Sequence, residues 1–171
     1  MDSQLISLPK EIIFCKTCVV SNQRPRVQFD ADGVCDACNY AKVKNFHIDW
    51  EKKEIELIKL LESHRSKDGN YDVLVPGSGG KDSSYVANLL KHKYGMNPLC
   101  ITCAPFSYTD IGQKNLNNFI DSGFNNIVYY PRGDIHSKLA RASFEILGDP
   151  FLPFIYTQKA RAFRVAKQYG I

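Results

Sequence analysis

The chain has 171 residues, 44% of them hydrophobic and 23% charged, which is ordinary globular composition and excludes a disordered, collagen-like or coiled-coil chain. Its 22 Lys and Arg against 18 Asp and Glu give a net charge of +4, too small to indicate a nucleic-acid-binding surface. Because the sequence shows neither a run of eighteen apolar residues nor a secretory leader, we expect a cytoplasmic protein that enters no membrane and keeps its cysteines reduced.

Residues 1–49 are predicted to form a small zinc-ribbon-like module, because they contain two CxxC pairs. Sixteen residues separate Cys15 and Cys18 from Cys35 and Cys38. The two pairs supply the four thiolates that tetrahedral Zn²⁺ requires, at the spacing of structural zinc sites. The segment between them is expected to form a hairpin, with a strand at 26–29 and a turn at 30–33. The alternative is four unrelated cysteines in a reduced core.

Residues 50–171 alternate between helical and strand-like patterns. We expect helices at 51–65, 82–94, 109–122, 134–147 and 156–169, and strands at 72–76, 99–104 and 126–130. Asp49 and Thr109 are expected to be N-caps, and the Pro-bounded segment 149–154 is expected to connect two helices. This order predicts an α/β fold, a parallel sheet with helices on both faces. Since three strands make a small sheet, we expect residues 50–171 to be the N-terminal part of a larger domain, and the 171-residue chain alone to be inactive.

A glycine-rich loop, Gly77–Ser84, joins the first expected strand to a helix. Glycines let a phosphate approach the backbone, and free N–H groups at a helix start point toward it. The Asp82 carboxylate would repel phosphate unless a cation lay between them, so Asp82 is predicted to bind Mg²⁺. The phosphate oxygens are expected to contact Ser78, Gly79, Gly80, Lys81, Ser83 and Ser84. The alternative is an ordinary glycine turn capped by Asp82 or Ser83.

A third CxxC pair, Cys100 and Cys103, falls inside an expected strand. Strand alternation directs these two side chains to opposite faces, so they are expected to be small buried hydrophobic residues. The alternative is a redox pair or iron–sulfur ligands.

Residues 78–83, SGGKDS, resemble the loop of the PP-loop ATP pyrophosphatases, also called adenine nucleotide alpha hydrolases. The resemblance implies an adenine nucleotide alpha hydrolase-like fold and cleavage of ATP between its α and β phosphates. Such an enzyme adenylates an oxygen of its substrate and releases pyrophosphate, which makes Lys81 and Asp82 the candidate catalytic residues.

Further segments resemble the N-acetyl sugar amidotransferases of surface polysaccharide (lipopolysaccharide) biosynthesis and flagellin glycosylation. They are the cysteine pairs, 24–30, 33–38, 48–50, 71–73, the loop and 148–151. The similarity runs essentially end to end and covers only the N-terminal part of such proteins. It implies that an N-acetyl group on a sugar becomes an acetamidino group, using ATP and ammonia from a separate glutaminase subunit. It also makes Asp149, in the shared segment 148–151, a candidate substrate residue.

Two other functions remain open. PP-loop enzymes that thiolate tRNA also join paired CxxC motifs to SGGKDS, but they need a further cysteine set, and only Cys100 and Cys103 remain here. The second alternative is a nucleotide-binding module without catalytic activity.

Overall fold

The computed structural model describes residues 9–171, in two compact units, one ending at Ile55 and the other running from Glu56 to Ile171. The division falls within helix α2 (Trp50–Ser63). Residues 1–8, where the sequence predicts no secretory leader, lie outside the described part. Within residues 9–171, no helix combines the length and the apolar character needed to cross a bilayer.

The first unit is organised around its cysteines, and Cys15 and Cys35 are the buried residues in its described part. The expected turn at 30–33 is present: the Gly33 N–H donates to the Asp30 carbonyl at 3.0 Å, and Gly33 has φ +77°. The expected hairpin is reduced to one antiparallel bridge between Phe29 and Cys35. The turn at 30–33 and the Phe29–Cys35 bridge thus fold the linker so that the two CxxC pairs lie together.

Helix α1 (Asp36–Phe46) follows the second cysteine pair and is not predicted by the sequence pattern. Its N-cap is Cys35, whose side chain accepts the Cys38 N–H. The sequence of α1 lacks the apolar stripe by which an amphipathic helix is recognised, and in the structure none of its residues is buried. The helix is thus specified by its N-terminal cysteine turn and not by a hydrophobic face.

Helix α2 begins where the sequence predicts. The Lys52 N–H donates to Asp49 Oδ1 at 2.9 Å, so Asp49 acts as the N-cap. The indole of Trp50 donates to the carbonyl of Lys44 at 3.0 Å, which ties the start of α2 to the last turn of α1.

The second unit is α/β, as predicted, with a three-stranded parallel sheet. Its strands are β1 (Val73–Pro76), β2 (Pro98–Cys103) and β3 (Asn125–Tyr129), in the spatial order β1-β2-β3. Leu74 pairs with Leu99, and Ile101 pairs with Ile127. The connections are α3 (Lys81–Asn88), which continues as the π-helix η1 (Leu89–Lys93), and α4 (Asp110–Asp121).

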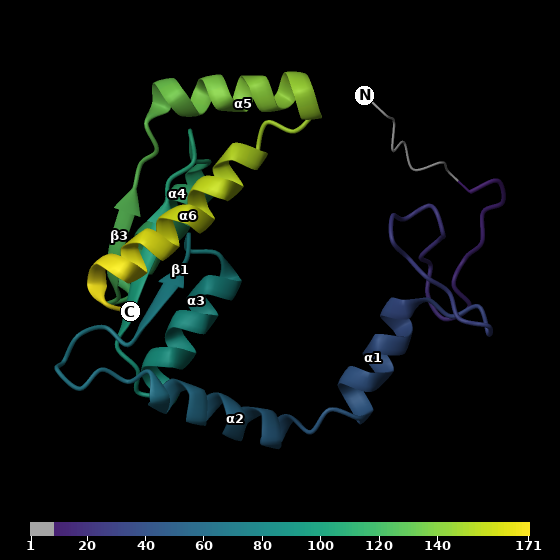
Figure 1. Cartoon of the computed structure of the whole chain (residues 1–171), viewed down its shortest axis with the longest axis horizontal. Helices are drawn as coiled ribbons and strands as arrows, with labels where there is room; N and C mark the ends of the chain where they lie inside the picture. Colours follow the sequence, from purple (N-terminus) through teal and green to yellow (C-terminus); the bar gives the residue numbers. More distant parts are fainter. Residues whose placement is uncertain (1–8) are drawn as a thin grey trace. The chain divides into compact units, whose positions relative to one another are not determined.

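Helices cover both faces of the sheet, also as predicted (Figure 1). On one face Val75 and Cys100 form a buried cluster with Ala87 from α3 and Phe119 from α4. On the other face Leu99 and Ile101 pack against Val165 of α6 (Leu152–Tyr169). The strands are hydrophobic on both sides because each side is covered.

The C-terminal helices differ from the prediction at one boundary. Helix α5 (Gly133–Leu147) ends before Gly148, which has φ +73°. Helix α6 begins at Leu152, four residues earlier than expected, and includes Pro153 in its first turn. Proline has no N–H that a first helical turn would need, and its φ already suits a helix, so Pro153 belongs to the first turn of α6 and not to the connecting segment.

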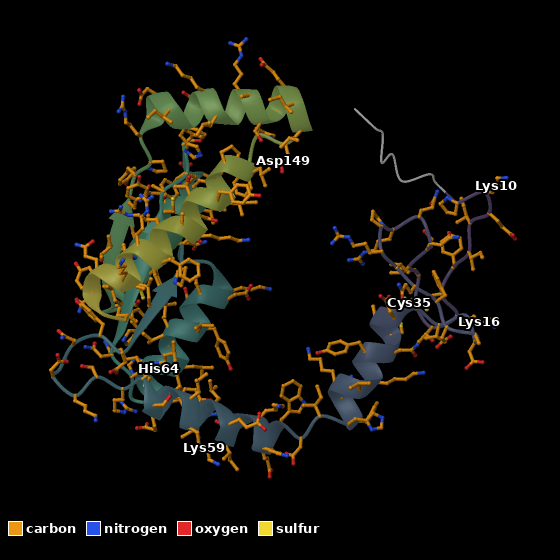
Figure 2. The ribbon with its side chains drawn as sticks, viewed as in Figure 1. Lys10, Lys16, Cys35, Lys59, His64 and Asp149 are labelled. Atoms are coloured by element: carbon orange, nitrogen blue, oxygen red, sulfur yellow. The ribbon has the colours of Figure 1, made fainter. Side chains whose placement is uncertain are left out.

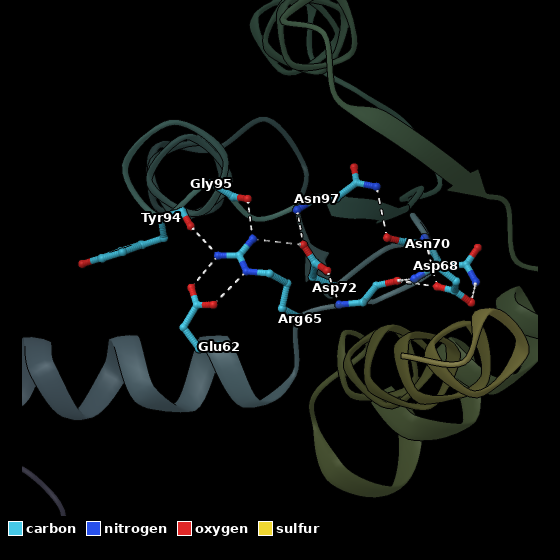
Figure 3. Close-up of polar contacts among 9 residues, drawn as sticks. Glu62, Arg65, Asp68, Asn70, Asp72, Tyr94, Gly95 and Asn97 are labelled. Atoms are coloured by element: carbon cyan, nitrogen blue, oxygen red, sulfur yellow. Dashed lines mark hydrogen bonds and ion pairs between the residues drawn. The ribbon is translucent and has the colours of Figure 1, made fainter.

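Arg65, just after α2, fastens that helix to the loop before β2 (Figure 3). Its guanidinium donates to the carbonyls of Gly95 at 2.7 Å and Tyr94 at 3.0 Å, and pairs with Glu62 at 2.6 Å. These contacts lie at the amino ends of the strands, so the carboxyl ends remain available for a site.

Candidate functional site

The first candidate site is the four-cysteine cluster. All four Sγ atoms lie within 4.8 Å of one another, from Cys15, Cys18, Cys35 and Cys38. The Sγ atoms of Cys15 and Cys38 are 4.0 Å apart, and those of Cys18 and Cys35 are 3.7 Å apart. A zinc ion with four Zn–S bonds of about 2.3 Å requires S–S distances of about 3.8 Å. The cluster therefore has the dimensions to hold one tetrahedral metal ion such as zinc.

Backbone N–H groups donate to the sulfur atoms of Cys15 and Cys35. Cys15 Sγ accepts the N–H of Cys35 at 3.2 Å and that of Thr17 at 3.3 Å. Burial by itself would raise the pKa of the Cys15 thiol, but these N–H groups stabilise the thiolate and bring the pKa down to about 6. Hydrogen bonding with Cys18 raises the pKa of Cys38 to about 12. The positive end of α1 also faces the cluster, because Cys35 is its N-cap (Figure 2).

The second candidate site is the loop after β1. The Gly77 N–H donates to the Ile101 carbonyl at 2.9 Å, so the first residue of the loop is still hydrogen-bonded to β2. Gly80, with φ −71° and ψ 158°, is the N-cap of α3 and provides no capping side chain. The first hydrogen bond of α3 runs from the Ser84 N–H to the Gly80 carbonyl at 3.1 Å. The N–H groups of 81–83 precede that bond, and such groups at a helix start are donors for an anion.

Gly79 is required by its conformation and by its neighbours. It has φ +80°, in the left-handed region that favours glycine. A Cβ at this position would lie 2.7 Å from the carbonyl carbon and 3.0 Å from the amide nitrogen of the peptide bond joining Asn115 to Leu116. The loop therefore rests directly on the backbone of α4.

Gly77 is required for a different reason. A Cβ there would lie 3.0 Å from Cβ of Ser83 and 3.2 Å from Cζ of Phe119. The Ser83 hydroxyl donates to the Gly80 carbonyl at 3.1 Å, which holds that side chain across the loop. The glycines thus allow a loop that is folded tightly between β1, α3 and α4.

A cavity of about 1080 Å³ opens beside this loop. From the loop and the first turn of α3 it is lined by Gly77, Ser78, Gly80, Lys81, Asp82 and Ser83. Gly79 and Ser84, which the sequence places in the same site, are not lining residues. The exposed Lys81 and Asp82 thus share with Ser78 the end of the cavity at the carboxyl edge of the sheet, where α/β proteins bind ligands, and the cavity continues along the whole of β1.

The wall formed by α6 is a feature that the sequence reasoning misses. Gln158, Lys159, Arg161 and Phe163 come from this helix. The Arg161 guanidinium lies 4.3 Å from the ring centroid of Tyr129, the last residue of β3. Its Nε is buried and has no hydrogen-bond partner within residues 9–171. A sequence signal existed: Gln158 and Arg161 precede the apolar Ala162 and Val165 at helical spacing, but only the tertiary fold shows what they face.

The third CxxC pair is divided between the two faces, as predicted. Cys100 is buried in the cluster with α3 and α4, whereas Cys103 lines the cavity on the side of α6. Burial raises the pKa of the Cys103 thiol, and the charge of Arg161 opposes that shift only in part. Cys103 is therefore a largely buried residue of the cavity wall.

Asp149 lies outside the cavity lining, in the exposed turn between α5 and α6 (Figure 2). Its Oδ1 accepts the Phe151 N–H at 2.8 Å, and its carbonyl accepts the Ser143 hydroxyl at 2.6 Å. These contacts define Asp149 as a turn residue that shapes the entry into α6.

No family model matches the chain. An uncharacterized protein of Methanocaldococcus jannaschii is 30% identical to it over 88 residues. The match covers 51% of this chain, and it spans only 31% of the length of that relative. Because that relative is uncharacterized, the similarity assigns no activity to this chain.

Proposed function

We propose that this protein is an ATP-dependent, AMP-forming amidotransferase with an adenine nucleotide alpha hydrolase-like fold. The observation that carries the proposal is the loop: a parallel strand, a glycine turn packed on α4, and a helix start that opens into a large cavity. The SGGKDS sequence of this loop and the resemblance of the chain to N-acetyl sugar amidotransferases support the specific chemistry.

The loop residues bind the leaving group in this proposal. Asp82 would hold Mg²⁺ between its carboxylate and the phosphates, because a carboxylate beside phosphate needs a cation. Lys81 and the N–H groups of α3 hold the two terminal phosphoryl groups, which leaves the α-phosphorus open to a substrate oxygen. ATP supplies the activation, since an amide oxygen leaves readily only after adenylation.

We also propose that the cysteine cluster binds zinc and that this zinc is structural. Four thiolates complete a tetrahedral shell, so such a site has no open position for a substrate or water. Its function would be to fold residues 9–49, which bury few side chains of their own.

The substrate class and the partner follow from the resemblance. The proposed substrate is a sugar with an N-acetyl group, and the proposed product is an acetamidino sugar. Ammonia attacks only unprotonated, and in neutral water it is mostly ammonium. A glutaminase subunit would therefore deliver ammonia directly, in the cytoplasm where ATP is available. Free ammonium at alkaline pH is expected to replace that subunit.

The tRNA-thiolating alternative is less well supported. Such an enzyme needs a second cysteine set, and the remaining pair, Cys100 and Cys103, faces opposite sides of the sheet. The net charge of +4 is too small to indicate a basic surface for tRNA.

Separation of the products of labelled ATP tests the proposal. AMP and pyrophosphate should form only with an N-acetylated sugar and a nitrogen source. Asp82→Asn should abolish the reaction, and Asp121→Asn, at the far end of α4, should not. ADP as the sugar-dependent product would overturn the proposal. Sulfur incorporated into tRNA would favour the thiolase, and nucleotide binding without turnover would favour the non-catalytic module.

A further inference from the structure

Within residues 9–171, no acidic side chain forms an ion pair with Arg161. In the part of the chain that the structure describes, its buried Nε has no hydrogen-bond partner either. Arg161 also lines the cavity, so the terminal N–H groups of its guanidinium are available to an anion bound there.

The position of Arg161 is fixed by packing. Its guanidinium stacks on Tyr129 at 4.3 Å from the ring centroid, which restricts a side chain that otherwise has many rotamers. The following residues of α6, Ala162 and Val165, pack against the sheet in the cluster with Leu99 and Ile101. The charge is therefore held at the carboxyl ends of β2 and β3.

The charged residues of the cavity favour an anion. Its charged lining residues are Lys81, Asp82, Lys159 and Arg161, three positive and one negative. Lys159 is exposed and solvated, whereas Arg161 is half-buried, so an anion gains more from Arg161. Beside the sheet the lining is apolar, with Val75, Ile101 and Ala162. Positive charge is thus found at the loop and at the α6 wall.

We propose that Arg161 binds the α-phosphoryl group of ATP, while Lys81 and Asp82 hold the two terminal phosphoryl groups. The inference rests on the proposed function, because it takes ATP as the occupant of the cavity. A guanidinium presents two parallel N–H groups to two phosphate oxygens, a geometry that lysine lacks. Arg161 therefore binds the phosphoryl group that reacts, and Tyr129 orients the guanidinium for it.

Calorimetry with three probes in Mg²⁺ buffer tests this assignment. Pyrophosphate occupies the loop alone, AMP brings the α-phosphoryl group, and adenosine has neither. Arg161→Gln should weaken AMP binding by about tenfold to a hundredfold, the usual effect of a charge-assisted hydrogen bond. It should leave pyrophosphate binding within about twofold and cause no difference for adenosine. The matched control is Arg164→Gln, an exposed arginine of α6 that does not line the cavity and should change nothing.

The outcomes separate the two proposals. AMP affinity unchanged in Arg161→Gln, or all three probes weakened equally, overturns the α-phosphoryl assignment, even if Lys81→Ala abolishes pyrophosphate binding as the proposed function requires. A wild-type protein that binds neither pyrophosphate nor AMP overturns both. If Arg161→Gln fails to fold by circular dichroism, Arg161→Lys and Arg161→Met replace it. Both keep a long stem over Tyr129, and AMP must bind more tightly to the lysine variant.

Discussion

The backbone N–H of Asn97 donates to Oδ2 of Asp72 at 2.6 Å, although the two residues are 25 positions apart. The other carboxylate oxygen accepts the Ser66 N–H, also at 2.6 Å (Figure 3). Asp72 directly precedes β1 and Asn97 directly precedes β2. One buried carboxylate therefore aligns the starts of two neighbouring strands, at the edge of the sheet opposite the glycine-rich loop Gly77–Ser84.

Asp72→Asn should lower the free energy of unfolding by about 2 kcal/mol, because one amide N–H₂ would then face a backbone N–H at a buried site. Urea unfolding followed by circular dichroism measures the loss. Asp121→Asn, an exposed acid on α4, is the control and should stay within about 0.5 kcal/mol of wild type. Equal stability of the two variants would contradict the role given to Asp72.

Gly79→Ala should destabilise the protein by about 3 kcal/mol, from a left-handed backbone together with a clash against Asn115. Gly148→Ala is the matched control, since Gly148 has φ +73° but a Cβ added there would meet no atom within 4 Å. Gly148→Ala should lower the free energy of unfolding by about 1 kcal/mol, the contribution of the left-handed backbone alone. Urea unfolding of both variants gives the difference, and a difference near zero would show that the loop does not rest on α4.

Cys35→Ser should release the metal, which we expect at one zinc per chain in the wild type, and should make residues 9–49 sensitive to protease. Cys103→Ala, outside the cluster, should keep its metal. Acidification should also release zinc, because each thiolate that leaves the metal takes up a proton and affinity falls as pH falls. Metal analysis by mass spectrometry gives the stoichiometry. Less than half an equivalent in well-folded protein would overturn the zinc assignment.

Asp82→Asn and Lys81→Ala should differ in their response to magnesium. Asp82→Asn removes the proposed ligand of the cation, so ATP binding should weaken far more with Mg²⁺ than without it. Lys81→Ala removes a direct phosphate contact and should weaken both. Calorimetry at both conditions provides the comparison. Equal losses in the two variants, with and without Mg²⁺, would show that these roles are wrongly assigned.

The sequence predicts the elements that have a periodic apolar pattern or a recognisable cap. The three strands, the caps Asp49 and Thr109, and the helices after β1 and β2 belong to this group. Helix α1 is not predicted because none of its residues is buried and its sequence has no apolar stripe. The start of α6 is predicted four residues too late because the φ of Pro153 suits both a turn and a first helical turn. The π-helical end of α3 has no signal in the residue pattern.

The two candidate sites differ in how local they are. The cysteine pairs and the SGGKDS loop are short motifs, so a few residues at fixed spacing are enough to indicate them as candidate sites. Arg161 contributes from α6, far along the chain from the loop, and its place on the cavity wall depends on which face of the sheet α6 covers. That choice is made by the packing of Val165 on Leu99 and Ile101, which no local pattern specifies.

The strand order has a consequence for folding kinetics. Each strand pairs with the next one in the chain, Val73 with Pro98 and Leu99 with Asn125, so the sheet grows by successive short loop closures. Helix α6 comes well after both strands in the sequence and packs against β1 and β2, so these contacts join residues that are far apart in the chain. We therefore expect the face with α3 and α4 to form early and the face with Leu99 and Ile101 to stay bare until α6 docks. A ribosome-bound chain from which α6 has not yet emerged would expose this apolar surface, and at that stage a chaperone that covers it would prevent aggregation most effectively.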